Sequence, residues 1–179
     1  SIWPAQQYNI PVKLLNTMEP DAPGTTITAK EQGSGVKALA AKDGITAIKI
    51  KSTRMLLAYG FLRKVFEVFE KYKTSIDMIT TSEVAVSVTI DDLSHLAEII
   101  KELEIYGTVE VDSNQTIVSI VGNMIAESKG TMAKIMNCLK DYPIRMVSYG
   151  GSRHNVSLLL EAKYKNEALK SLNEGLFEW

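Results

Sequence analysis

The sequence predicts an α+β protein made of two similar units in tandem, here called the first and the second repeat, each with the element order β α β β α β. A strand, a polar turn and another strand occur twice, at 74–90 and at 142–162. Asp77 and Arg145 occupy the same position in the two copies, 145 − 77 = 68 residues apart. This spacing is too long for a solenoid repeat and suits a small module used twice.

The composition is that of a globular chain without a dominant charge. With 179 residues, 45% of them hydrophobic and 23% charged, it has room for one large domain or two small ones. A net charge of −1 gives no overall positive field to attract nucleic acid or an anionic membrane, so neither is expected as a partner. No apolar run approaches the ~20 residues of a membrane span, and no signal-peptide pattern opens the chain. The single Cys138 cannot form an internal disulfide, so a cytoplasmic location is expected.

The segment from residue 1 to about 41 differs in composition from the rest of the chain. Residues 10–17 could form a buried strand, but Pro20, Pro23 and Gly24 then enforce turns, and a polar run occupies 30–37. Without a covering helix or a partner strand, the segment cannot bury much surface alone. It is predicted to be the tail of another domain with a linker.

The first repeat is predicted at 52–113. A strand at Ile45–Lys51 precedes an amphipathic helix that begins after Gly60, and Val84 to Ile90 alternate as in a sheet with one face on a core. A second helix comes after Asp91 and Asp92, which are capping residue types, and TVEVDS closes the repeat. The apolar positions of the two helices are spaced by three or four residues: Phe61, Leu62, Val65, Phe66, Phe69 and Tyr72, then Leu93, Leu96, Ile99, Ile100 and Leu103.

The second repeat is predicted at 114–179 and is short of one strand. A strand at 116–122, a helix around Ile135, a strand pair around Gly150 and a helix at 164–173 leave no room for a closing strand. Because an open sheet edge must find a partner, the early half of Ile45–Lys51 is expected to complete the second repeat. The repeats would then be interleaved.

The chain resembles the tandem ACT domains of an aspartokinase, a pair of ferredoxin-like domains. The resemblance rests on the duplicated order and on four motifs, MLLAYGFLRKVFEVF from Met55, SIDMITTSEVAVSVT from Ser75, IRMVSYGGSRHNVSLLL from Ile144 and the ending LNEGLFEW. These motifs are similar to those of the monofunctional, lysine-inhibited enzymes. IPVKLLNTMEPDAPGT from Ile10 resembles the carboxyl end of their kinase domain, so the residues at 1–41 are identified as that tail and a linker.

The resemblance implies a regulatory region without catalytic residues or a metal site of its own. The family's kinase domain phosphorylates the β-carboxylate of aspartate and uses ATP and Mg, and most of that domain is missing here. The resemblance further implies L-lysine as feedback inhibitor, a homodimer formed through the ACT domains, and the chain's own kinase domain as the partner that it controls.

The effector site is expected in the first repeat. The unsatisfied N–H groups at a helix start can bind the carboxylate of an amino acid, and Gly60 permits close approach. Asp77 and Glu83 could each bind one ammonium of lysine, whereas Arg145 in the second repeat would repel it. With the resemblance, the expected effector-binding residues are Met55, Ala58, Tyr59, Gly60, Phe61, Leu62, Ser75, Ile76, Asp77, Thr81, Ser82 and Glu83.

Simpler interpretations remain open at this point. Asp77 could be a solvated strand residue, Gly60 a plain loop glycine, and the residues at 80–83 an ordinary hairpin turn. A free-standing amino-acid sensor that acts on a partner protein is an alternative function. A small independent enzyme is another, but the sequence has no paired nucleophile and base, no metal cluster and no phosphate loop.

Overall fold

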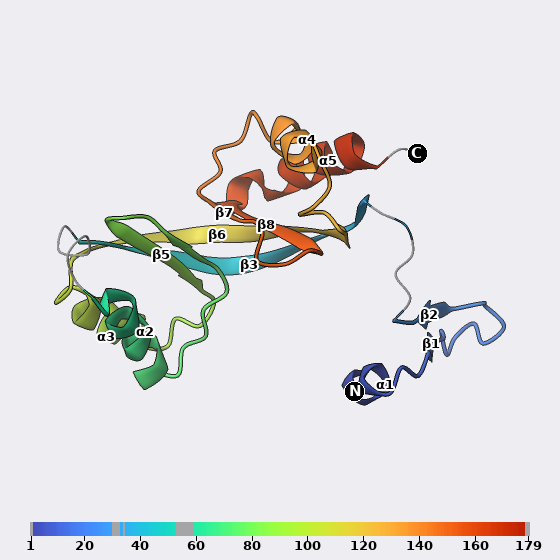
Figure 1. Ribbon diagram of the computed structural model, residues 1–179, viewed down its shortest axis with the longest axis horizontal. Coiled ribbons are helices and arrows are strands. Elements are labelled where there is room, and N and C mark those ends of the chain that lie inside the picture. The colour runs from blue at the N-terminus through green and yellow to red at the C-terminus, as the bar shows by residue number, and fades with distance from the viewer. Residues whose placement is uncertain (1, 30–32, 34, 53–58, 178–179) are drawn as a thin grey trace. The chain divides into compact units, whose positions relative to one another are not determined.

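The computed structural model describes residues 2–29, 33, 35–52 and 59–177, and the chain divides into two compact bodies, Ser1–Ser34 and Gly35–Trp179 (Figure 1). We call them the amino-terminal body and the main body. In the amino-terminal body, α1 (Trp3–Gln7) precedes an antiparallel pair of short strands, β1 (Val12–Leu14) and β2 (Thr25–Ile27). Among the described residues, no helix is long and apolar enough to cross a membrane.

The main body is a six-stranded antiparallel sheet with helices, in the strand order β4-β5-β3-β6-β8-β7. This confirms the predicted fold class, two interleaved βαββαβ domains. Its first elements are β3 (Gly35–Lys51), α2 (Phe61–Lys71), β4 (Ile79–Thr81), β5 (Ala85–Ile90) and α3 (Leu96–Leu103). They are followed by β6 (Thr108–Asn123), α4 (Thr131–Cys138), β7 (Met146–Ser148), β8 (Asn155–Glu161), a short 3-10 helix (Ala162–Tyr164) and α5 (Lys165–Leu176).

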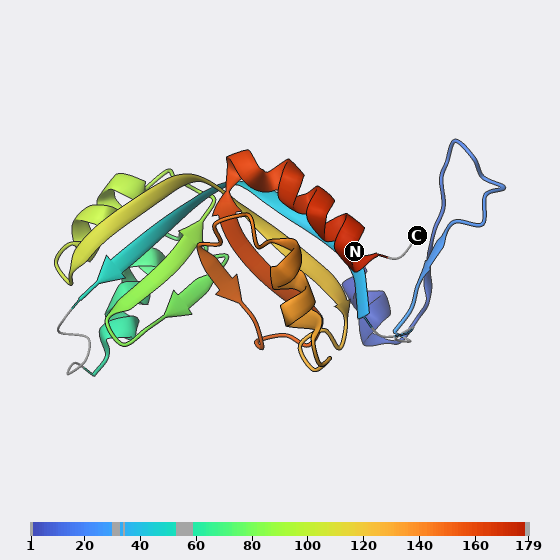
Figure 2. The ribbon, with the colours of Figure 1, turned by 90° about the horizontal axis from the view of Figure 1, so that it is seen from above.

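Two long strands, β3 and β6, run side by side through both repeats (Figure 2). The late part of β3, from Thr46 to Lys51, pairs with β5 of the first repeat. The early part, from Gly35 to Lys42, lies beside the late part of β6, which pairs on its other side with β8. Each repeat thus takes one half of each long strand.

This pairing corrects one expectation from the sequence. Ile45–Lys51 was expected to give its early half to the second repeat, and residues 1–41 to form a tail and linker. Instead Gly35–Lys42 completes the second repeat and Thr46–Lys51 stays in the first. The strand begins earlier than predicted. The sequence pattern missed its early part because Val36 to Ala41 is rich in alanine, a residue with a weak strand preference.

Both long strands change register where the repeats meet. Gly44 on β3 has a φ of 73° and Asn114 on β6 a φ of 55°, a conformation that glycine and asparagine tolerate best. The register of β3 against β6 shifts between Lys42 and Ile45 and again between Ile45 and Ala47. Such bulges bend a strand and increase its twist.

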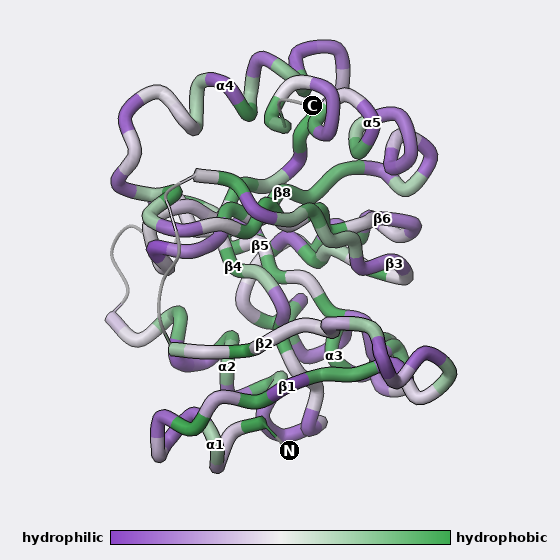
Figure 3. The backbone as a smooth tube through the Cα atoms, turned by 90° about the vertical axis from the view of Figure 1, so that its right-hand side faces the viewer, coloured by the Kyte–Doolittle hydropathy of each residue, from purple (hydrophilic) through white to green (hydrophobic). Residues whose placement is uncertain are grey.

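Each repeat has its own apolar core on the helix-bearing face of the sheet. Ile48, Ile50, Val86 and Val88 pack with α2 and α3, whereas the second core packs beneath α4 and α5. In Figures 1 and 3 the two helix pairs lie on opposite sides of the strands, because one face of this twisted sheet turns along the long strands. The second core contains Val118, Ile120, Ile125, Ile135, Leu139, Val156, Leu158, Leu160, Ala168 and Leu172.

A third apolar cluster lies on the other face of the sheet, where no helix packs among the described elements. Ile45 and Ala47 contribute to it while their neighbours Ile48 and Ile50 point into the first core, as expected of alternating strand residues. Met78 precedes β4 and Met146 begins β7, and these two edge strands contact each other. The sheet therefore curls around this cluster, which joins the two repeats.

Candidate functional site

The two repeats start their first helices in the same way. Gly60 precedes α2 with a φ of 81°, and Gly130 precedes α4 with a φ of 79°. In both cases the glycine carbonyl accepts the first helical hydrogen bond, from Lys64 N at 3.2 Å and from Lys134 N at 2.9 Å. No side chain among the described residues caps either start; a helix start without such a cap can bind an anion.

The expected site residues around α2 are only partly described. Tyr59 is fully exposed, Phe61 is buried in the first core, and Leu62 is partly exposed on the helix surface. Met55 and Ala58 lie outside the described residues. The helix start is therefore bordered by aromatic and apolar side chains.

The remaining expected residues fall into two groups at opposite ends of β4. Thr81, Ser82 and Glu83 form an exposed turn beside Ser52, whose backbone N donates to Val84 O at 2.9 Å. Ser75, Ile76 and Asp77 lie at the far end, where Asp77 N donates to Thr89 O at 2.9 Å. Six residues of extended chain span about 20 Å. Asp77 and Glu83 of one chain thus lie too far apart to bind one small molecule together.

Asp77 has an ammonium beside it within the chain. Lys42 Nζ lies 2.7 Å from Asp77 Oδ1 and 2.8 Å from Asp91 Oδ2. The side chain of Asp77 is 23% exposed and that of Lys42 is 46% exposed. Hydrogen bonds to Asp77 and Asp91 raise the pKa of Lys42, and the same lysine holds the pKa of Asp91 below its usual value. Sequence reasoning missed Lys42 and Asp91, because neither lies in a motif near Asp77.

In the second repeat the corresponding groups are bound by other parts of the chain. Arg145, in the position of Asp77, forms an ion pair with Asp112. The loop before α4 is fastened at two points, since Tyr149 OH donates to Ala126 O at 2.8 Å and Arg153 Nε lies 2.8 Å from Glu127 Oε1. The loop also buries Ile125 completely in the second core. The loop is thus held in place by its own chain, and at the helix start Thr131 N donates to Ser128 O at 3.4 Å.

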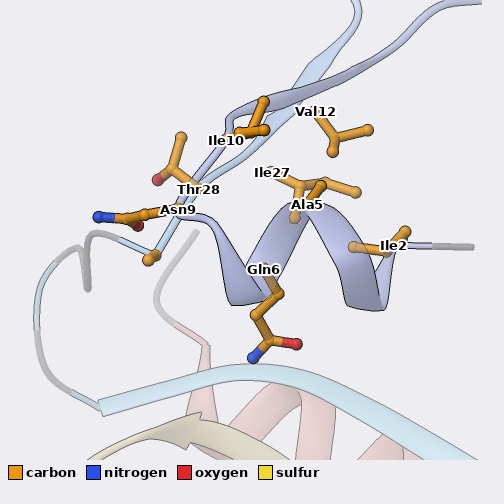
Figure 4. A pocket seen from close by; sticks show the side chains of 9 residues that line it. Ile2, Ala5, Gln6, Asn9, Ile10, Val12, Ile27 and Thr28 are labelled. Atoms are coloured by element: carbon orange, nitrogen blue, oxygen red, sulfur yellow. The ribbon is translucent and has the colours of Figure 1, made fainter.

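Two hollows offer alternative sites. An open groove of about 850 Å³ lies at the Ser52 end of the first repeat, between the turn at Ser82 and the loop around Tyr106. A pocket of about 190 Å³ lies in the amino-terminal body between α1 and the strand pair (Figure 4). Its lining is mostly apolar, with Ile2, Ile10 and Ile27 among the residues, and lacks a charged group for an amino acid. No group of His, Cys, Asp and Glu suited to a metal ion occurs among the described residues.

Comparisons with known proteins agree with this architecture. A sequence model of the ACT domain matches residues 118–176. The structure of a C-terminal regulatory domain of aspartate kinase from Porphyromonas gingivalis W83 is 48% identical, with a TM-score of 0.72, and the match covers 79% of this chain and 97% of that one. E. coli aspartokinase III in complex with lysine and aspartate is 31% identical with a TM-score of 0.85, over 99% of this chain and 41% of that one.

Among curated proteins, the chloroplastic aspartokinase 3 of Arabidopsis thaliana is 36% identical over 99% of this chain. The chain spans only 34% of that relative, and about a third of the other chloroplastic aspartokinases of the same plant. The part of these relatives that this chain matches is the one that contains ACT domains, in agreement with the duplicated motifs and the interleaved sheet. The chain belongs to the aspartokinase family, as its C-terminal regulatory region built of ACT domains.

Proposed function

We propose that this chain senses L-lysine and thereby controls an attached kinase domain that phosphorylates L-aspartate to 4-phospho-L-aspartate. One observation carries the choice of site. The two repeats share a glycine-led helix start, but Tyr149 and Arg153 fasten the loop before the second, whereas the first repeat has exposed polar groups in the turn Thr81–Glu83 beside Ser52. The lysine-bound E. coli aspartokinase III, similar over 99% of this chain, supports lysine as the ligand.

The effector is proposed to bind between two copies of the chain. Asp77 and Glu83 of one copy are about 20 Å apart along β4, but β4 is an edge strand of the sheet. If two copies pair β4 antiparallel about Thr80, Asp77 of one copy lies opposite Glu83 of the other. One lysine could then bind carboxylates from two chains and place its own carboxylate at a helix start.

Control of the kinase follows from linkage. Lysine can inhibit only if it binds the inactive arrangement more tightly than the active one. The kinase domain, which would bind aspartate, ATP and Mg²⁺, is proposed to cover part of the amino-terminal body. The large apolar side chains that this body exposes support the idea; they include Trp3, Tyr8, Leu14 and Met18. The free thiol of Cys138 suits a reducing compartment such as the cytoplasm.

Titration calorimetry of the chain with L-lysine and L-threonine tests the effector. We expect lysine to bind far more tightly, because two carboxylates match its two ammonium groups. Asp77→Ala should weaken lysine binding by about 1.5 to 3 kcal/mol, or roughly 10- to 150-fold, the effect of a lost charge-assisted hydrogen bond. Asp112→Ala, which removes the carboxylate of the second repeat's ion pair, is the matched control and should bind as the parent does. Clear threonine binding without lysine binding would overturn the assignment.

Sedimentation of the chain, with and without lysine, tests the shared site. We expect a dimer that lysine tightens, since a ligand bound between two copies must favour their association to the same degree. A chain that stays monomeric at tens of micromolar in saturating lysine would show that the site does not lie between copies.

A further inference from the structure

The ion pairs of Asp77 and Arg145 occupy equivalent positions in the two repeats, but the acidic and the basic residue exchange places between them. Lys42 and Asp112, their partners on the long strands, are 112 − 42 = 70 residues apart. Gly60 and Gly130 before the two helices have the same spacing of 130 − 60 = 70 residues. In one repeat the long strand supplies the cation and the residue before the edge strand supplies the anion. In the other repeat the roles are exchanged.

Each of these ion pairs joins one repeat to the other. Lys42 pairs with Ile117 on the second-repeat half of β3, yet its ammonium contacts Asp77 of the first repeat. Asp112 lies on the first-repeat half of β6 and binds Arg145 of the second. Next to both pairs are Met78 and Met146, the residues through which the edge strands join the third apolar cluster.

We propose that Lys42 is an internal competitor for the effector: its ammonium occupies Asp77 until an amino-acid ammonium displaces it, and its release removes one of the ion pairs that Lys42 forms with the first repeat. This inference rests on the proposed function, because it requires lysine to bind at Asp77. The side chain of Lys42 ends in the same ammonium group as the free effector L-lysine, so the two compete for the carboxylate of Asp77.

Asp91 makes this exchange possible at low cost. Lys42 Nζ lies 2.8 Å from Asp91 Oδ2, so after losing Asp77 it keeps a carboxylate within reach. The ammonium stays paired, but the second-repeat half of β3 then keeps one ion pair with the first repeat, through Asp91, where it had two. The lost contact with Asp77 lies beside the register shift at Ile45, where the long strands depart from regular pairing. Binding at Asp77 would thus loosen the charge contact between the repeats without breaking it.

Lysine titration of Lys42→Met at about 0.15 M salt tests the competition. Removing the competitor should tighten lysine binding about two- to five-fold, the effect of an exposed ion pair. Lys163→Met is the matched control, because it removes one positive charge and an ion pair, with Glu161 at 2.7 Å, from the second repeat. The control should bind lysine as the parent does. Asp91→Asn should have the opposite effect and weaken binding, because Lys42 then holds Asp77 without an alternative.

The NMR signal of the Lys42 side chain in the parent protein gives a readout that does not depend on a folded variant. It should shift when lysine is added and stay in place in Asp77→Asn. Equal or weaker lysine binding by Lys42→Met, or a signal that does not move in a parent that binds lysine, would overturn the role of Lys42. A parent that binds no lysine would instead remove the proposed function itself, and the inference with it.

Discussion

Adding a single Cβ atom at Gly122, by substitution with alanine, tests the interleaving of the two repeats. Gly122 lies on β6 opposite Val36, within the early part of β3 that completes the second repeat. A Cβ added at Gly122 would overlap the carbonyl oxygen of Gly35 and lie 2.8 Å from both Val36 Cα and Ile125 Cδ1. Two of these three atoms are backbone atoms of β3, which cannot turn away as a flexible side chain can. Gly122→Ala must therefore push β3 away from β6.

The expected cost is that of overpacking a close contact, about 1 to 3 kcal/mol. For a chain of this size, each kcal/mol lowers the Tm by about 2 to 4 °C, so Gly122→Ala should melt roughly 2 to 12 °C below the parent. Gly151→Ala is the matched control, because a Cβ there meets nothing within 4 Å and the backbone φ is not positive. The control should stay within about 0.5 kcal/mol of the parent.

Thermal and urea unfolding followed by circular dichroism measure both variants. If Gly122→Ala were as stable as Gly151→Ala, the segment from Gly35 to Lys42 would not lie against the end of β6. The interleaved pairing would then be refuted, whatever the stability of the rest of the sheet.

Two further predictions concern the same sheet. A chain starting at Gln115 lacks β3 and leaves the late half of β6 paired with β8 alone, with an open edge on its other side, so it should show no cooperative thermal transition; native-like amide dispersion in that chain would contradict this. Stability should also fall in acid, because ion pairs and hydrogen bonds hold the carboxyl pKa values of Asp43, Asp91, Glu102 and Glu110 below their usual values. This contribution is complete above about pH 4.5 and is lost as pH falls through the lowered pKa values. An unchanged urea midpoint between pH 6 and pH 3 would refute it.

Local patterns predicted most of the elements. The spacing from Phe61 to Phe69 predicted α2, and the alternation from Val84 to Ile90 predicted β5, because each of these elements buries one regular face. The duplication predicted a tandem α+β fold, and the missing last strand predicted interleaving. These features could be read from the sequence because each depends on neighbouring residues or on a repeat long enough to detect.

The extent of β3 could not be read in the same way. Its early part is mostly half-buried or exposed, with Lys37 and three alanines between Val36 and Ala41, so no clean alternation marks it. It is a strand because the late half of β6, about 80 residues away in the chain, pairs with it. Tertiary pairing of this kind overrides a weak local preference.

The ion pairs change the reason for placing the effector in the first repeat. Arg145 was expected to repel an ammonium while Asp77 attracted one, as though both were unpaired. Each instead has an opposite charge from a long strand beside it, Asp112 and Lys42. The charge at that position is thus complementary to the charge of the strand residue beside it. By itself it does not identify a ligand. A second consideration is the helix-start loop of the second repeat, which Tyr149 and Arg153 fasten; its counterpart before α2 lies outside the described residues. A ligand at the second repeat would have to displace a loop whose Ile125 is buried in a core, and for this reason we propose the first repeat as the site.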